Sequence, residues 1–102
     1  MRAQLEAMLA AGRDTALLRF SLGECCLADG QPRLASEHLA RAVALDPGYS
    51  AAWKLYGKAL AAAGDREQAK GVFERGMEVA SEQGDHQAAK EMRVFRRRLD
   101  KA

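Results

Sequence analysis

The chain has 102 residues, of which 48% are apolar, 29% are charged and only 6% are aromatic. This length fits a single globular domain and is too short for two ordinary hydrophobic cores. Alanine, leucine, glutamate, arginine and lysine dominate while β-branched residues and aromatics are few, which favours helices and argues against a β-sandwich or barrel. The formal net charge of +2 argues against a protein that coats nucleic acid.

Five turn signals divide the chain into helical segments. Each signal pairs a helix stop, usually glycine, with a residue that can begin the next helix. Between the turns, apolar side chains recur at three- and four-residue steps, as in Leu18, Leu22 and Cys26, which predicts amphipathic helices. We therefore expect six helices and no strand. In chain order, the turns are expected at residues 12–14, 30–32, 46–50, 64–65 and 84–85.

A repeat of 34 residues underlies the middle of the chain. When the sequence is shifted by 34, small residues fall on small ones and large residues on large ones. Gly23 falls on Gly57, and because glycine inside a helix costs about 0.5–1 kcal/mol relative to alanine, this match predicts a close approach of two helices. The other matched pairs are Leu22 with Tyr56, Ala28 with Ala62, Gly30 with Gly64, Ala35 with Ala69, Leu39 with Phe73, Val43 with Met77 and Leu45 with Val79.

These positions resemble the tetratricopeptide repeat, a unit of two antiparallel helices. The resemblance covers residues 16–83, and it implies an all-α fold whose helical hairpins stack into a right-handed superhelix of about six helices. The first copy departs from the family pattern at Arg19, where a large residue is usual, and the second at Ser81, where proline is usual. The matching residues are Leu22, Gly23, Cys26, Ala35, Leu39, Ala42 and Pro47 in the first copy, and Trp53, Tyr56, Gly57, Leu60, Ala69, Phe73 and Gly76 in the second.

The repeat register divides the single expected domain, residues 1–102, into four parts. Residues 16–49 form the first repeat and residues 50–83 the second. Residues 1–15 align with the end of a repeat, so they are predicted to form a lone second helix that packs on the first repeat. Residues 84–102 are out of register and are predicted to form a capping helix. Its apolar side chains Ala88, Met92, Phe95 and Leu99 would cover the last repeat, while Lys90, Arg93, Arg97 and Lys101 face water.

The resemblance implies a protein-interaction module. In this family, the first helices of successive repeats line a concave groove that binds an extended peptide or a helix of a partner protein. The groove positions of this chain combine apolar residues with two lysines one helical turn apart, which suits a ligand with an apolar anchor and an acidic group. The positions expected to contact the partner are Leu17, Phe20, Glu24, Leu27, Lys54, Lys58 and Ala61.

Other interpretations of the same residues stay open. Leu17 or Phe20 can pack under the N-terminal helix instead of contacting a partner. Lys54 and Lys58 can simply be solvated. A module with so little groove can also self-associate, so a second copy of the chain is an alternative partner.

The charge at the C-terminus suggests a second class of function. Residues 90–102 carry six basic and two acidic residues, whereas residues 1–89 carry 10 and 12. The alternative to the groove is therefore weak, salt-sensitive binding of nucleic acid or another acidic surface by the C-terminal helix. We do not expect nucleic acid to be the main partner, because Phe95, the nearby aromatic residue, is needed for packing. The residues of this patch are Arg93, Arg96, Arg97, Arg98 and Lys101.

No pattern in the sequence predicts catalysis, a metal or a cofactor. The glycines are spaced for turns and packing rather than for a phosphate-binding loop. His38 and His86 are distant along the chain and are expected to lie exposed on helices, whereas Trp53 is expected in the core. The adjacent Cys25 and Cys26 cannot bridge distant segments, and no stretch approaches the ~20 apolar residues of a membrane span. We therefore expect a cytoplasmic protein without membrane contact.

Overall fold

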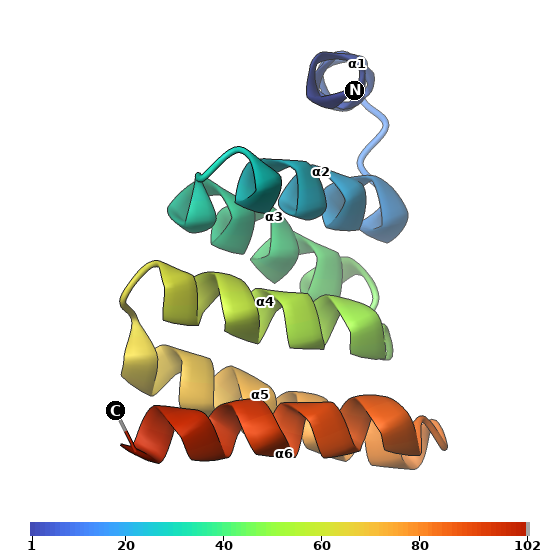
Figure 1. Ribbon diagram of the computed structural model, residues 1–102. Helices are drawn as coiled ribbons and strands as arrows, with labels where there is room; N and C mark the ends of the chain where they lie inside the picture. Colours follow the sequence, from blue (N-terminus) through green and yellow to red (C-terminus); the bar gives the residue numbers. More distant parts are fainter. Residues whose placement is uncertain (102) are drawn as a thin grey trace.

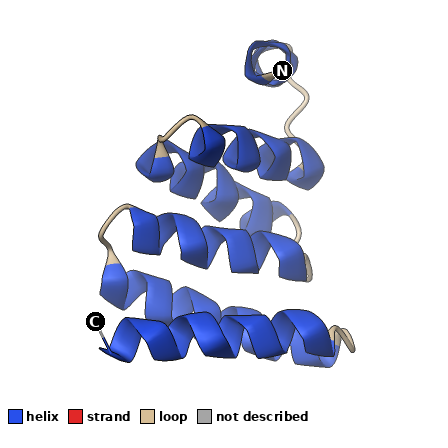
Figure 2. Cartoon of the chain, viewed as in Figure 1, coloured by secondary structure: helices blue, strands red, loops and turns tan. Residues whose placement is uncertain are grey.

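The computed structural model describes residues 1–101, which form six helices and no strand (Figures 1 and 2). The predicted all-α class and the predicted number of helices are confirmed. The helices are stacked one after another into an elongated body with extents of 40 × 29 × 17 Å. In chain order, α1 spans Arg2–Ala10, α2 Ala16–Ala28, α3 Pro32–Leu45, α4 Ser50–Ala62, α5 Arg66–Glu82 and α6 His86–Lys101.

Glycines create most of the turns that the sequence predicts. After α1, α2, α4 and α5 the chain contains a glycine with a positive φ, a conformation that other residues rarely adopt. The turn after α3 is built differently, because there the carboxylate of Asp46 accepts a hydrogen bond of 3.2 Å from the amide of Gly48. The glycines with positive φ are Gly12, Gly30, Gly64 and Gly84.

The two helices of each hairpin approach closely at the matched glycines. A Cβ atom on Gly23 would lie 2.6 Å from Cγ of Leu39, and a Cβ atom on Gly57 would overlap the ring of Phe73. Leu39 and Phe73 are both fully buried. Each glycine thus leaves room on the first helix for a large side chain of the second, as the 34-residue match predicts.

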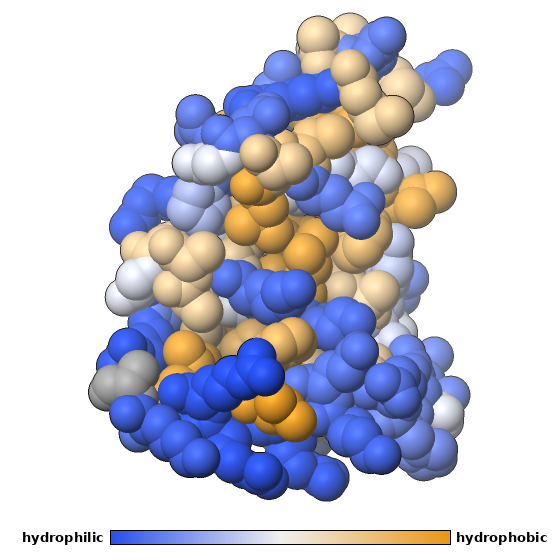
Figure 3. Space-filling model, in the orientation of Figure 1, coloured by the Kyte–Doolittle hydropathy of each residue, from blue (hydrophilic) through white to orange (hydrophobic). Residues whose placement is uncertain are grey.

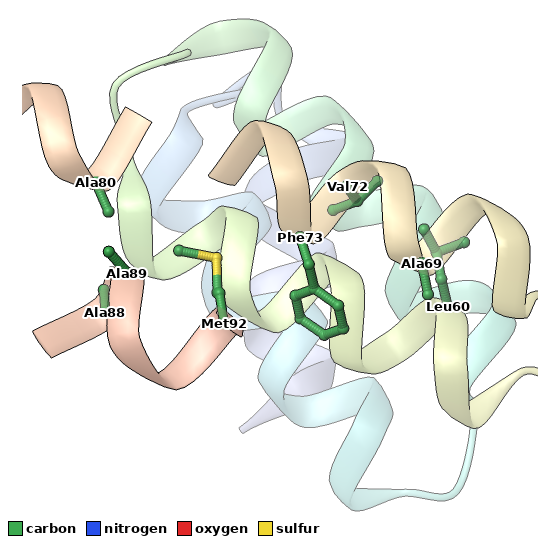
Figure 4. Close-up of a cluster of buried hydrophobic side chains, with 8 residues drawn as sticks. All are labelled: Leu60, Ala69, Val72, Phe73, Ala80, Ala88, Ala89 and Met92. Atoms are coloured by element: carbon green, nitrogen blue, oxygen red, sulfur yellow. The ribbon is translucent and has the colours of Figure 1, made fainter. Parts of the chain in front are cut away.

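The largest group of buried apolar side chains joins α4, α5 and α6 (Figure 4). Phe73 of α5 and Met92 of α6 are its largest fully buried members. Trp53 is half-buried rather than fully buried: it packs against this group, and its indole Nε1 donates a hydrogen bond of 2.8 Å to the carbonyl of Pro47. The buried residues are Leu60, Ala69, Val72, Phe73, Ala80, Ala88, Ala89 and Met92.

The N-terminal helix is attached less firmly than the others. Within residues 1–101, α1 contacts α2 and no other helix, and none of its own residues is fully buried. Figure 1 shows α1 end-on, at the edge of the stack. The N-terminal helix thus contacts the hairpin that follows it, but the contact is small.

His38 is buried, with only 9% of its surface exposed, so the expectation that it lies in solvent is wrong. Its ring is covered between α2 and α3, where Nη1 of Arg19 lies 3.0 Å from Nδ1. Because an arginine N–H can only donate, Nδ1 accepts this bond. Arg19 also forms an ion pair of 2.7 Å with Asp14. Burial, and then the charge of Arg19, lower the pKa of His38, so the neutral ring is the stable form in the fold.

This buried histidine predicts how stability depends on pH. The unfolded chain protonates His38 near the ordinary pKa of about 6.5, whereas the folded protein does so at lower pH. The free energy of unfolding should therefore fall as the pH is lowered from about 7 to about 5, above the range in which carboxylates such as Asp14 titrate. Urea unfolding at several pH values would measure this slope. Replacing His38 by glutamine should flatten the slope, and an unchanged slope would contradict the assignment.

Candidate functional site

Alternate helices line the concave face of the stack. Within residues 1–101, α2 contacts α4 and α4 contacts α6, whereas α3 and α5 do not touch each other. In a curved stack, the helices that touch lie on the inside of the curve and the helices that separate lie on the outside. The concave face is therefore formed by α2, α4 and α6, which lie nearest the viewer in Figure 1.

The C-terminal helix occupies the place of the first helix of a third repeat. α4 begins 34 residues after α2, whereas α6 begins 36 residues after α4. The 34-residue repeat of the sequence therefore does not extend to α6. At the start of α6, the carboxylate of Asp85 accepts hydrogen bonds from the hydroxyl of Ser50 at 2.8 Å and from the amide of Ala88 at 3.2 Å. This contact joins the beginnings of α4 and α6. The helix packs on α5 and α4, and it adds a third wall to the concave face.

The part of the concave face nearest the N-terminus is apolar. Leu17 is 66% exposed, and it lines a pocket of about 200 Å³ together with Leu5 and Met8 of α1. The ring of Phe20 is half-buried and lies 5.1 Å from the ring of Tyr49. Phe20 thus packs within the stack rather than under α1, while Leu17 lies beside α1 with most of its side chain in water. Figure 3 shows apolar surface across the middle of this face.

Three further positions that the sequence predicted for the groove, Glu24 and Leu27 of α2 and Ala61 of α4, differ in how far they are exposed. Glu24 is exposed and lies near Tyr49, whose pKa is raised by burial and, to a smaller extent, by the charge of Glu24. Leu27 and Ala61 are half-buried, and each packs against a group of buried core residues. Only part of these two side chains can therefore meet a ligand.

Both predicted lysines of α4 lie against α6. The Nζ atom of Lys54 donates a hydrogen bond of 2.8 Å to Glu91, and this bond holds the pKa of Glu91 below its ordinary value. The Nζ atom of Lys58 lies 5.2 Å from the centroid of the Phe95 ring. No ion pair of Lys58 is found among residues 1–101. Within this described range, the charge of Lys54 is thus matched by a carboxylate, whereas that of Lys58 is not.

The basic residues of the predicted C-terminal patch do not all share one face of α6: Arg93, Arg97 and Lys101 stand one turn apart on one face, whereas Arg96 and Arg98 lie elsewhere around the helix. Arg96 forms ion pairs with Glu74 and Asp100, whereas Arg98 lies over the Phe95 ring, 5.8 Å from its centroid. The dispersion follows from the helix, in which consecutive residues are separated by about 100°. Arg93, Arg97 and Lys101 are exposed, as is Lys90, in agreement with the sequence prediction.

Sequence reasoning missed a pocket on α6. It has a volume of about 250 Å³ and combines charged with apolar side chains. The three- and four-residue steps between its residues place them on one face of the helix, and this spacing was the available signal. Its lining residues are Lys90, Glu91, Val94, Phe95 and Arg98.

The described residues hold neither a metal-type cluster nor a membrane-spanning helix. No group of three or more His, Cys, Asp and Glu side chains that could bind a metal ion lies within residues 1–101. Over the same range, every helix is too short or too polar to cross a bilayer.

Comparison with known proteins now identifies the family. Residues 26–92 match the family model described as tetratricopeptide repeat. The chain belongs to the tetratricopeptide repeat family. It is 55% identical over 98 residues to the TPR repeat-containing protein PA0015 of Pseudomonas aeruginosa, in a match that covers 96% of this chain and 93% of the relative.

Two solved structures support the same tetratricopeptide repeat fold. The solution structure of protein BPP2914 from Bordetella parapertussis is 46% identical and superposes with a TM-score of 0.84, covering 99% of this chain and 88% of that one. The Sgt2 TPR domain from Aspergillus fumigatus is 20% identical, with a TM-score of 0.76 and coverage of 99% and 69%. The second likeness concerns the fold alone.

The family resemblance predicted from the sequence is therefore confirmed. The tetratricopeptide repeat is a fold of protein-interaction modules, and proteins of the family are typically scaffolds without catalytic activity. In this tetratricopeptide repeat protein, the concave face contains three helices, one more than the repeat register assigns.

Proposed function

We propose that the protein binds a segment of a partner protein on the concave face formed by α2, α4 and α6 and performs no catalysis. The observation that carries this proposal is the apolar surface on that face, where Leu17 is 66% exposed and Phe20 and Leu55 are half-buried. When a partner covers this apolar surface, the surface is removed from contact with water, and this burial favours association. A cytoplasmic location fits the adjacent free Cys25 and Cys26.

The size of the face limits the affinity for a short peptide. A stable protein–protein interface buries about 800 Å² on each partner, and three short helices offer less than that to an extended segment. We therefore expect a short peptide to bind with a Kd in the micromolar range or weaker. Tighter binding would require a partner that also contacts the ends of the stack.

Site-specific photocrosslinking in the native host tests the proposal. A benzophenone side chain would replace Leu17 or Glu24, the exposed groove positions of α2, and as controls Ala44 or Glu78, which are exposed on α3 and α5. We expect the two concave positions to give the same adduct and the two control positions to give none.

Two results of this experiment would contradict the proposal. Adducts that form only at Ala44 or Glu78 would place the partner on the outside of the stack. An adduct of twice the chain's own mass would identify a second copy of the chain as the occupant, instead of a separate partner.

A further inference from the structure

Two cations from different helices converge on the ring of Phe95. The Nζ atom of Lys58 in α4 lies 5.2 Å from the ring centroid, and the guanidinium carbon of Arg98 in α6 lies 5.8 Å from it. The ring itself is held by the core, because its centroid is 5.8 Å from that of Phe73. Among residues 1–101, neither Lys58 nor Arg98 forms an ion pair. Within the described residues, two positive charges without an ion-pair partner thus lie around one aromatic ring.

The surroundings of this ring are basic and apolar. Glu91 is the carboxylate that lines the adjoining pocket, and Lys54 already matches its charge at 2.8 Å. Lys90 also lines the pocket and is exposed, which adds to the positive charge. Val94 is 37% exposed and supplies an apolar wall beside Phe95. A ligand that fits must therefore bring negative charge next to an apolar group.

We propose that Lys58, Phe95 and Arg98 form a site for an acidic segment of a partner protein. Carboxylates of the segment pair with Lys58 and Arg98, and a neighbouring apolar side chain packs on Phe95 and Val94. Hydrogen bonds between carboxylates and charged donors are stronger than those between neutral groups, so this contact orients the segment. The inference rests on the proposed function and names the chemistry of the partner.

The arrangement favours a peptide over nucleic acid. Binding of a phosphate backbone gains affinity from several cations along one track. Here Arg96 is engaged by Glu74 and Asp100. Arg93 and Arg97 lie on another face of α6 than Phe95, because they are two residues before and after it, so two cations, Lys58 and Arg98, lie at the ring. The apolar wall of the pocket matches a leucine-like side chain.

A binding assay with the complete chain tests the site. The probe is a fluorescein-labelled decapeptide in which single leucines alternate with pairs of aspartates, and the matched probe has asparagine at every aspartate. We expect the acidic probe to bind more tightly than the asparagine probe, and more weakly as salt is added. The double variant Lys58→Gln, Arg98→Gln should raise its Kd about tenfold, because each exposed ion pair contributes modestly.

A control variant removes the same amount of charge elsewhere. Arg33→Gln with Arg66→Gln also loses two exposed cations, and neither of these arginines, on α3 and α5, lies over the Phe95 ring. We expect its Kd for the acidic probe to stay within about twofold of the original protein. Circular dichroism spectra of both variants would verify that the helices are intact.

Several outcomes would overturn the inference. These are equal binding of the two peptides, an unchanged Kd in the Lys58 and Arg98 variant, no binding at millimolar peptide, or tighter binding of a labelled single-stranded oligonucleotide at the same salt concentration. The outcome is separable from that of crosslinking. If adducts form at the concave positions but the variant binds the acidic peptide as well as the original protein does, this site is wrong and the proposed function stays. If the variant weakens peptide binding but no adduct forms at the concave positions, the proposed function is wrong and the preference of this site for an acidic peptide stays.

Discussion

Replacing Met92 by alanine should lower the free energy of unfolding by about 2–5 kcal/mol, the range for removing a large buried side chain. Met92 is fully buried between α6 and α5, and its Sδ atom occupies the space beside Gly76. Because Gly76 has no side chain, it cannot fill the cavity that the substitution leaves. Urea unfolding followed by circular dichroism and by fluorescence of Trp53, the sole tryptophan, would measure the loss.

The neighbouring Arg93 provides the control for this experiment. It is exposed on α6, so Arg93→Ala should change the free energy of unfolding by no more than about 0.5 kcal/mol. If Met92→Ala unfolded at the same urea concentration as the original protein, α6 would not be part of the cooperative core, and the third wall of the concave face would lose its support.

Gly57→Ala should destabilise the protein by about 1–3 kcal/mol, although alanine is the better helix former. The new methyl group would overlap the ring of Phe73, which is fully buried. The helices α4 and α5 must then move apart, or the ring must leave its position. Unfolding in urea gives the size of the effect, and adding Phe73→Leu should recover part of the loss because the two sites are in contact.

The same substitution at Gly71 should change the free energy of unfolding in the opposite direction. Gly71 lies inside α5, and a Cβ atom there would meet no described atom within 4 Å. Gly71→Ala should therefore stabilise the protein by about 0.5–1 kcal/mol, through helix propensity alone. Destabilisation at both glycines would show that the effect at Gly57 does not come from the close approach of two helices.

The hairpins could be predicted from the sequence because their contacts are local and repeated. Gly23 with Leu39 and Gly57 with Phe73 are each 16 residues apart, and the two pairs are related by the 34-residue shift. The turns were predictable for a similar reason, since a positive φ selects glycine at each of four helix ends. Short-range chemistry therefore determines the unit, and the repetition of the unit determines the stack.

The features that sequence reasoning missed depend on contacts between distant residues. The place of α6 was hidden because it begins two residues late relative to the repeat. The ion pair of Lys54 with Glu91 and the contact of Lys58 with Phe95 both span 37 residues and follow from that placement. The buried His38 contacts Arg19, which stands where the family usually has a large residue. Local sequence patterns do not predict which charged side chains of different helices will contact each other.

The three helices of the concave face set a scale for the segment that the proposed site could contact. Arg93 stands eight positions into α6, where α2 and α4 have Gly23 and Gly57, so α6 lacks the small residue that allows close helix contact in the two hairpins. With helices about 10 Å apart, three of them span roughly 20–30 Å. An extended chain advances about 3.3 Å per residue, so a segment of about six to nine residues would span the face. The proposed site would then recognise no more than this much of a partner's sequence at once.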